Sequence, residues 1–233
     1  MTKTEVMKLL RENKNERGIA NWKKRHADSG LKSFGIGLTQ LRKLAKQIGR
    51  DHDLARKLWD TDVYDAKIVG LLIDEPKKIT REQVEEQVQD TDIGLLAHVF
   101  GACDATLAKA PFAVELADEW TEAEDPQRRR VAYALLYELS KNTRNKALTD
   151  DFFLGHIEWI EQEIHDEEMW VREAMNSALM GIGKRNKKLN KAAIKAAKAI
   201  GPVDIDYGDD NSCEPLDVMK HLTADYVKKK LYG

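Results

Sequence analysis

The sequence predicts an all-α protein, built as a right-handed superhelical solenoid of HEAT-like helix pairs with about eleven to thirteen helices. Three observations predict this class. Only 5 of the 233 residues are proline, and the helix formers Ala, Leu, Glu and Lys dominate. No segment shows the sustained alternation of apolar and polar residues, bounded by turns, that marks β-hairpins. Residues that start and end helices recur along the whole chain.

The individual helices follow from these start and stop residues. Thr39 precedes an amphipathic stretch that stops at Gly49, and Thr80 opens the T-x-x-Q pattern of a capping box. Pro111 and Pro126 occupy helix-opening positions, where proline is tolerated. About eleven predicted helices lie near 3–13, 15–27, 39–48, 51–59, 62–74, 80–89, 92–108, 112–122, 126–140, 150–163 and 167–182. One or two more follow near 188–200 and 215–231.

Four of these helices share a pattern that indicates an internal repeat. They begin at Asp62, Asp92, Asp125 and Asp166, each at a plausible N-cap position. The spacings of 30, 33 and 41 residues are typical of helix pairs in HEAT-type or armadillo-type arrays. We therefore expect one HEAT-like domain over 1–233, in which the tail 201–233 packs as a cap. A single globular bundle is the alternative.

Charge is segregated along the chain although the formal net charge is only −2. Residues 1–60 carry 15 Lys and Arg against 7 Asp and Glu, a net charge of +8. Residues 61–127 carry 5 against 16, a net charge of −11, and residues 184–233 return to +4. Basic ends around an acidic middle are typical of a polyanion-binding surface, and solvated helix faces are the alternative.

Corresponding positions of the repeat place basic side chains on one face. Lys67 and Arg130 lie five residues after a leading aspartate, and Arg172 lies six residues after one. If the helix pairs stack, these three side chains line one inner wall, to which phosphates of duplex DNA would bind. The other predicted DNA-binding cations are Arg128, Arg129, Lys184, Arg185, Lys187 and Lys188.

Several ordered segments carry a family resemblance: FGIGLTQLRKLAKQIG, LARKLWDTDVYDAKIVGLLID, RRRVAYALL, WVREAMNSALMGIGKRN and GPVDIDYGDDNSCEPLD. In this order they resemble the bacterial DNA-alkylation-repair glycosylases built from HEAT-like repeats. The resemblance implies that duplex DNA is cradled on a concave face. It also implies hydrolysis of the N-glycosidic bond of cationic N3- or N7-alkylpurines without a metal or other cofactor. In that family a carboxylate supports the oxocarbenium sugar, two tryptophans approach the DNA backbone, and an arginine holds a phosphate.

The chain departs from that pattern at the acid and at both tryptophan positions. The family's acid follows a tryptophan by four residues, whereas Asp104 follows Phe100 by four, which makes Asp104 a candidate acid and Phe100 a candidate DNA contact. By the register of the repeat, however, the acid position holds Ala97 or His98. Histidine is a second catalytic candidate, but it does not supply the negative charge of a carboxylate. The second tryptophan position falls near Ser177.

The family's arginine is better matched. RRRVAYALL resembles the arginine-bearing helix, so either Arg129 or Arg130 is the expected phosphate anchor, with a solvated helix start as the alternative. The alternative role of His98 is packing in the core. The alternative for Asp104 is that it is a polar residue at a helix end without a function in catalysis. Trp170 lies at the start of a helix that is expected to line the concave face, where it either contacts DNA or packs in the core.

Together these patterns predict a cytoplasmic, monomeric DNA-binding protein of the alkylation-repair type. Excision of cationic alkylpurines is the enzymatic version of this prediction. A non-catalytic protein that recognises DNA shape or junctions and a helical scaffold for protein partners are the alternatives. The acidic turn 204–210 lacks the full pattern of a calcium-binding loop, so no metal site is expected. No apolar run is long enough to span a membrane, and two cysteines are too few for a disulfide framework.

Overall fold

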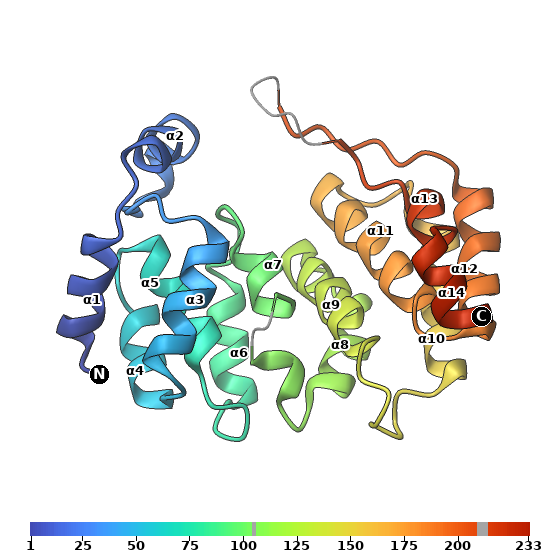
Figure 1. The fold of residues 1–233 in the computed structure, drawn as a ribbon, viewed down its shortest axis with the longest axis horizontal. Helices are drawn as coiled ribbons and strands as arrows, with labels where there is room; N and C mark the ends of the chain where they lie inside the picture. Colours follow the sequence, from blue (N-terminus) through green and yellow to red (C-terminus); the bar gives the residue numbers. More distant parts are fainter. Residues whose placement is uncertain (104–105, 209–213) are drawn as a thin grey trace. The chain divides into compact units, whose positions relative to one another are not determined.

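The computed structural model describes residues 1–103, 106–208 and 214–233. These residues form fourteen α-helices and two short 3-10 helices, with no β-strand among them beyond a single isolated bridge (Figure 1). The predicted all-helical class is therefore confirmed. The helices gather into two compact units, Met1–Phe112 and Ala113–Gly233. None of the described helices combines the length and apolar character that a membrane span requires.

The first unit is built around a single buried helix, α5. Its α-helices are α1 (Lys3–Glu12), α2 (Glu16–His26), α3 (Leu38–Ile48), α4 (His52–Trp59), α5 (Tyr64–Ile73), α6 (Arg81–Val88) and α7 (Leu96–Gly101), with 3-10 turns at Ala27–Ser29 and Leu107–Lys109. All ten residues of α5 are buried, because α3, α4 and α7 pack around it. A helix that is apolar on nearly every side belongs in a core.

Asp65 and Gly70, both inside α5, show how closely the neighbouring segments pack on this helix. Asp65 accepts hydrogen bonds from the backbone amides of Phe34 at 2.7 Å and Ile36 at 2.9 Å, which secures the loop before α3. Gly70 lets α4 approach closely, since a Cβ atom there would lie 2.9 Å from the carbonyl oxygen of Ala55. The buried carboxylate is thus a structural group, in keeping with the rule that buried polar groups are hydrogen-bonded.

The second unit is centred on two long helices, α9 and α11. Its helices are α8 (Ala113–Thr121), α9 (Pro126–Leu139), α10 (Asp150–Glu163), α11 (Met169–Gly183), α12 (Lys187–Ile200), α13 (Val218–Leu222) and α14 (Asp225–Tyr232). Helix α9 packs against α8 and α11, while α12 packs against α10 and α11. The largest side chains fully buried in this unit are Trp120, Tyr133 and Phe153.

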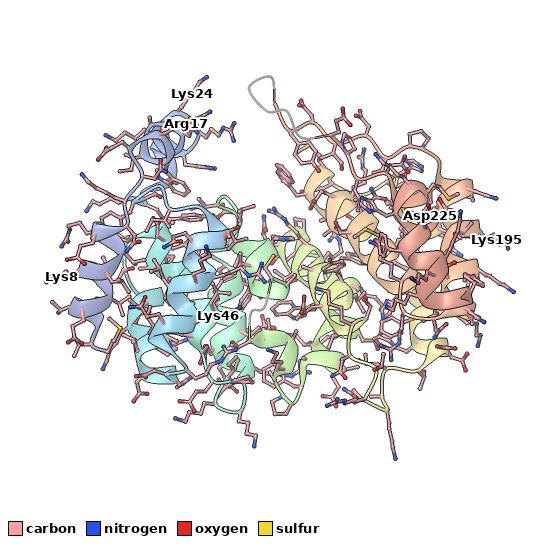
Figure 2. The ribbon with its side chains drawn as sticks, viewed as in Figure 1. Lys8, Arg17, Lys24, Lys46, Lys195 and Asp225 are labelled. Carbon is pink, nitrogen blue, oxygen red and sulfur yellow. The ribbon has the colours of Figure 1, made fainter. Side chains whose placement is uncertain are left out.

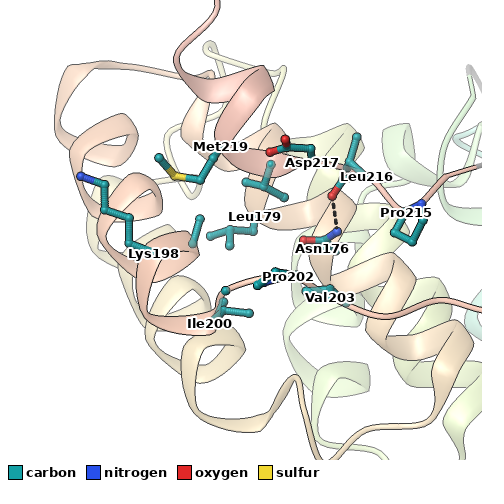
Figure 3. A pocket seen from close by; sticks show the side chains of 13 residues that line it. Asn176, Leu179, Lys198, Ile200, Pro202, Val203, Pro215, Leu216, Asp217 and Met219 are labelled. Carbon is teal, nitrogen blue, oxygen red and sulfur yellow. Dashed lines mark hydrogen bonds between the residues drawn. The ribbon is translucent and has the colours of Figure 1, made fainter.

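The described parts of the tail, 201–208 and 214–233, pack on α11 and α12. Asn176 donates a hydrogen bond to the carbonyl of Leu216 at 2.8 Å, and the Tyr232 hydroxyl donates to the side-chain oxygen of Asn190 at 3.0 Å. Between the tail and the two helices lies a cavity of about 380 Å³ with mainly apolar walls (Figure 3). The tail therefore covers apolar surface of α11 and α12.

The predicted helix over 92–108 is wrong at both ends. Helix α7 comprises only Leu96–Gly101, because the backbone takes left-handed φ angles at Gly94 (58°) and Cys103 (58°). A helix cannot continue through such residues. The stretch that follows in the described chain forms only the 3-10 turn Leu107–Lys109.

The predicted N-caps are right for one leading aspartate and wrong for three. Asp125 caps α9 by accepting a hydrogen bond from the amide of Gln127 at 3.0 Å. The N-caps of the other three helices lie one to three residues later than predicted, at Val63, Leu95 and Glu168. None of these three caps forms a side-chain cap hydrogen bond.

Candidate functional site

In the first unit, Lys67 and Phe100 lie in the core beside Trp59. The ammonium of Lys67 donates to the carbonyl oxygen of Trp59 at 2.8 Å and lies 4.4 Å from the centre of its ring. The ring of Phe100 stacks on Trp59 at a centroid distance of 6.4 Å. Lys67 is 7% exposed and Phe100 is 2% exposed. Both side chains therefore serve packing, and neither offers a surface to DNA in this structure.

The predicted catalytic positions lie near the end of α7. Asp104 is outside the described residues. Ala97 is fully buried, whereas His98 is half-buried and its Nε2 atom lies 2.9 Å from the Sγ atom of Cys103. Which of the two atoms holds the proton depends on the tautomer of the imidazole. A catalytic role for His98 or Asp104 stays a prediction.

Arg129 is held at the start of α9 by a dense set of hydrogen bonds. Its guanidinium forms a bidentate ion pair with Glu167, at 2.7 and 2.9 Å, and donates to the carbonyl oxygens of Ala123 and Glu124 at 2.7 and 2.8 Å. The bonds to Glu167 raise the pKa of Arg129 further above its ordinary value. Arg129 therefore ties α9 to the segment before α11, and its charge is already matched by a carboxylate.

Arg128, next to it, is also engaged. Its guanidinium forms an ion pair with Asp125 at 2.6 Å and lies 5.8 Å from the ring centre of Trp120. Asp125 is also the N-cap of α9, so the same carboxylate caps the helix and pairs with the guanidinium of Arg128.

The C-terminal basic residues divide into structural and exposed members. The half-buried Arg185 donates to the carbonyl oxygens of Ser140, Asn142 and Leu148 at 2.7 to 3.0 Å, and its burial lowers its pKa. Lys188 is exposed and lies 3.2 Å from a carboxylate oxygen of Asp151. Arg185 thus stabilises the loop between α9 and α10. Of the lysines in this set, Lys187 and Lys188 are exposed and Lys184 is half-buried.

Two of those lysines contact the last helix. The ammonium of Lys184 lies 5.6 Å from the ring centre of Tyr226, and that of Lys187 lies 5.6 Å from the ring centre of Tyr232. These cation–π contacts help to hold α14 against the start of α12.

Arg130 belongs to a different group, which we call the aromatic–arginine cluster and define as Arg130, Trp170 and Tyr207. The Arg130 guanidinium lies 5.0 Å from the ring centre of Trp170. The ring centres of Trp170 and Tyr207 are 6.0 Å apart, and the two ring planes form an angle of 55°. Arg130 is 6% exposed, whereas Trp170 is 40% exposed. The cluster therefore presents an aromatic surface to solvent above a buried cation.

Arg172 positions the tail beside this cluster. It donates to the carbonyl oxygens of Glu167 at 2.9 Å and Asp204 at 3.3 Å, so it links the start of α11 to the segment that carries Tyr207. Its Nε atom is buried and has no hydrogen-bond partner among the described residues. Arg130 and Arg172 thus act at the same end of α11, while Lys67 belongs to the other unit.

Glu173 completes the surroundings of the cluster and was not singled out by the sequence patterns. It lies three residues after Trp170 on α11 and is half-buried. Burial raises the pKa of its carboxyl group, and the nearby charge of Arg130 opposes that rise. The only signal in the sequence was the i, i+3 spacing from Trp170. The described residues contain no group of three or more potential metal ligands.

This arrangement suits binding of a flat group that lies next to a negative charge. An exposed indole can stack on a nucleobase or a sugar, and each such stack is worth about 1–3 kcal/mol. Arg130 and Arg172 bring positive charge to the same helix end, where phosphates would be attracted. Glu173 adds an acidic group whose proton affinity is raised by burial.

Comparison with known proteins agrees with the resemblance in the sequence. Residues 6–208 match a family model described as DNA alkylation repair enzyme. An uncharacterised protein of Listeria innocua is 24% identical over 201 residues, which cover 82% of this chain and 83% of that protein. An uncharacterised protein of Listeria monocytogenes is 23% identical with the same coverage.

A solved structure shares the fold with a TM-score of 0.84 and 22% identity, over 99% of this chain and 96% of the other. It is described as belonging to a new family of proteins related to the HEAT-like repeat DNA glycosylases, with affinity for branched DNA structures. At this identity the likeness shows the fold alone, and it confirms the predicted HEAT-like helical fold.

Proposed function

The chain belongs to the DNA alkylation repair enzyme family, and from this premise we propose that it binds DNA through the aromatic–arginine cluster at the start of α11. One observation carries the proposal: Trp170 is 40% exposed although a charged neighbour and a second aromatic ring hold it in place. An exposed, oriented indole favours a stacking partner, because tryptophan, with its apolar ring and polar N–H group, is enriched at interfaces.

The chemistry of the cluster favours nucleic acid as the partner. Bases offer faces for stacking on Trp170, and phosphates offer charge to the arginines beside it. Branched DNA has exposed base faces where its strands part, which suits an aromatic group at the surface better than an intact duplex does. The solved structure with affinity for branched DNA supports the same choice. The protein would act as a monomer in the cytoplasm.

The binding test compares two exposed tryptophans. Trp170→Ala should weaken binding to a four-way junction by about 1–3 kcal/mol, measured by fluorescence anisotropy at several salt concentrations. Trp159→Ala is the matched control, because Trp159 is 41% exposed on α10 and lies outside the cluster. Equal affinities of the two variants for the junction would refute the proposal.

Excision of N3- or N7-alkylpurines without a metal is the second candidate function. The observation that favours it is Glu173, an acidic side chain one helical turn from Trp170. A carboxylate at such a position can support the positive charge that develops on the sugar. Release of N7-methylguanine from methylated DNA, measured with the wild-type protein and Glu173→Gln, tests it. If the wild-type protein releases no N7-methylguanine, excision is ruled out and DNA binding is the remaining proposed function.

A further inference from the structure

We propose that the first unit carries a binding site for one phosphate group, formed by Arg42, Lys46 and Arg50. The site lies outside the aromatic–arginine cluster and belongs to the other unit of the chain. The three side chains open into a cavity of about 240 Å³. The described lining of this cavity consists of Arg42, Ala45, Lys46, Gly49, Arg50 and Leu72, and none of these is acidic.

The local sequence brings the three cations together. Arg42 and Lys46 are four residues apart on α3, so they lie on the same helix face (Figure 2 labels Lys46). Gly49 ends that helix with a φ of 85°, a left-handed angle that glycine adopts without strain. The turn at Gly49 sets Arg50 against the end of α5, beside the same cavity.

Arg50 is fixed in position before any ligand arrives. Its Nη1 atom donates to the carbonyl oxygens of Leu72 at 2.6 Å and Asp74 at 3.2 Å. A guanidinium has five N–H donors, so Nε and Nη2 keep three, and these have no partner among the described residues. A guanidinium held in this way loses little entropy when it binds an anion.

The charge balance at the cavity favours an anion. The C-terminus of α3 carries about half a negative charge from its unpaired carbonyls, which opposes anion binding. The full positive charges of Lys46 and Arg50 outweigh this effect. Within the described part of the chain, Lys46 and Arg50 form no salt bridge that would satisfy them. The surrounding segment 1–60 is the most basic part of the sequence.

The size of the cavity limits what it can hold. Its volume lies below the roughly 300–1,000 Å³ of pockets that enclose drug-sized ligands, so it suits a single phosphate group better than a whole nucleotide. That phosphate belongs either to a nucleic-acid backbone or to free inorganic phosphate. The nucleic-acid source rests on the proposed function, whereas the free-phosphate source does not.

The test uses the full chain and a neutral substitution of the exposed lysine. Inorganic phosphate is titrated into the protein and followed by NMR, and junction binding is measured against salt. Lys46→Gln should weaken phosphate binding about tenfold, since it removes one charge-assisted hydrogen bond. If the phosphate is part of DNA, the slope of log K against log salt should also fall by about 0.9. Lys43→Gln is the matched control on the same helix, outside the cavity lining.

The outcomes separate the sources and the two proposals. Weaker phosphate binding with a smaller salt slope assigns the site to the DNA backbone. Weaker phosphate binding with an unchanged slope assigns it to free phosphate. No binding of phosphate by the wild type, or equal loss in Lys43→Gln and Lys46→Gln, overturns the site. If the wild type binds no DNA at all, the proposed function fails, but the phosphate titration still decides the cavity.

Discussion

Two cation–tryptophan pairs, one in each unit, have different roles, although their cations occupy corresponding positions of the predicted repeat. Lys67 and Arg130 are both buried, and each lies over an indole, at 4.4 and 5.0 Å. The tryptophans differ: Trp59 is 4% exposed, and Trp170 is 40% exposed. The register of the sequence thus identified equivalent cations, but the burial of the aromatic partner separates a core contact from a surface site.

The largest expected effect concerns stability and contrasts the two tryptophans. Trp59→Ala should lower the free energy of unfolding by about 3–5 kcal/mol, because it leaves a cavity under Lys67 and Phe100. Trp170→Ala should cost much less, since a large part of its surface is in water in the folded state. Urea unfolding of both variants provides the measurement, and similar losses would show that the two pairs have the same role.

A smaller effect is expected for the buried lysine. Lys67→Ala should lower the free energy of unfolding by about 1.5–3 kcal/mol, because a charge-assisted hydrogen bond to Trp59 is lost. Asp90, 3.5 Å from the ammonium, is well exposed and stays solvated. Junction affinity of the folded variant should equal that of the wild type. Weaker DNA binding at unchanged stability would instead make Lys67 a DNA contact.

The smallest effect is a pH dependence at Glu173. Its pKa is raised in the folded state, so folding favours the protonated form, and the ionised form costs stability as pH rises from about 4.5 through the folded pKa. Glu173→Gln should therefore match the wild type at pH 4 and be more stable at pH 8. Adding Arg130→Gln to the wild type should raise the pKa of Glu173 further, since the opposing charge is gone. Parallel pH curves for the wild type and Glu173→Gln would contradict this assignment.

Much of the fold could be predicted because its signals are local. Thr80 and Asp125 cap their helices as expected, and Pro126 opens α9. The prediction failed over 92–108, where left-handed residues at Gly94 and Cys103 interrupt the helix. Apolar periodicity continues through that stretch, so the pattern alone does not reveal the break.

The candidate site could be predicted only in part. Arg130 and Arg172 were expected at one surface, and both act at the same end of α11. Arg129 has the same local sequence context as Arg130, yet its guanidinium forms an ion pair with Glu167. The two residues of that ion pair are 38 positions apart in the sequence. The sequence of the helix that carries Arg129 therefore does not predict the pair.

By itself, the sequence determined that the chain is helical, where most helices begin and end, and which positions of the repeat carry cations. These properties depend on caps and periodicity within a few residues. Only the tertiary structure decided which cations are buried in the core and which lie beside an exposed ring. Burial depends on contacts between distant segments, such as Tyr207 against Trp170 and the loop amide of Phe34 on Asp65. Solvent exposure, and with it the ability to meet a ligand, is a property of the packed chain.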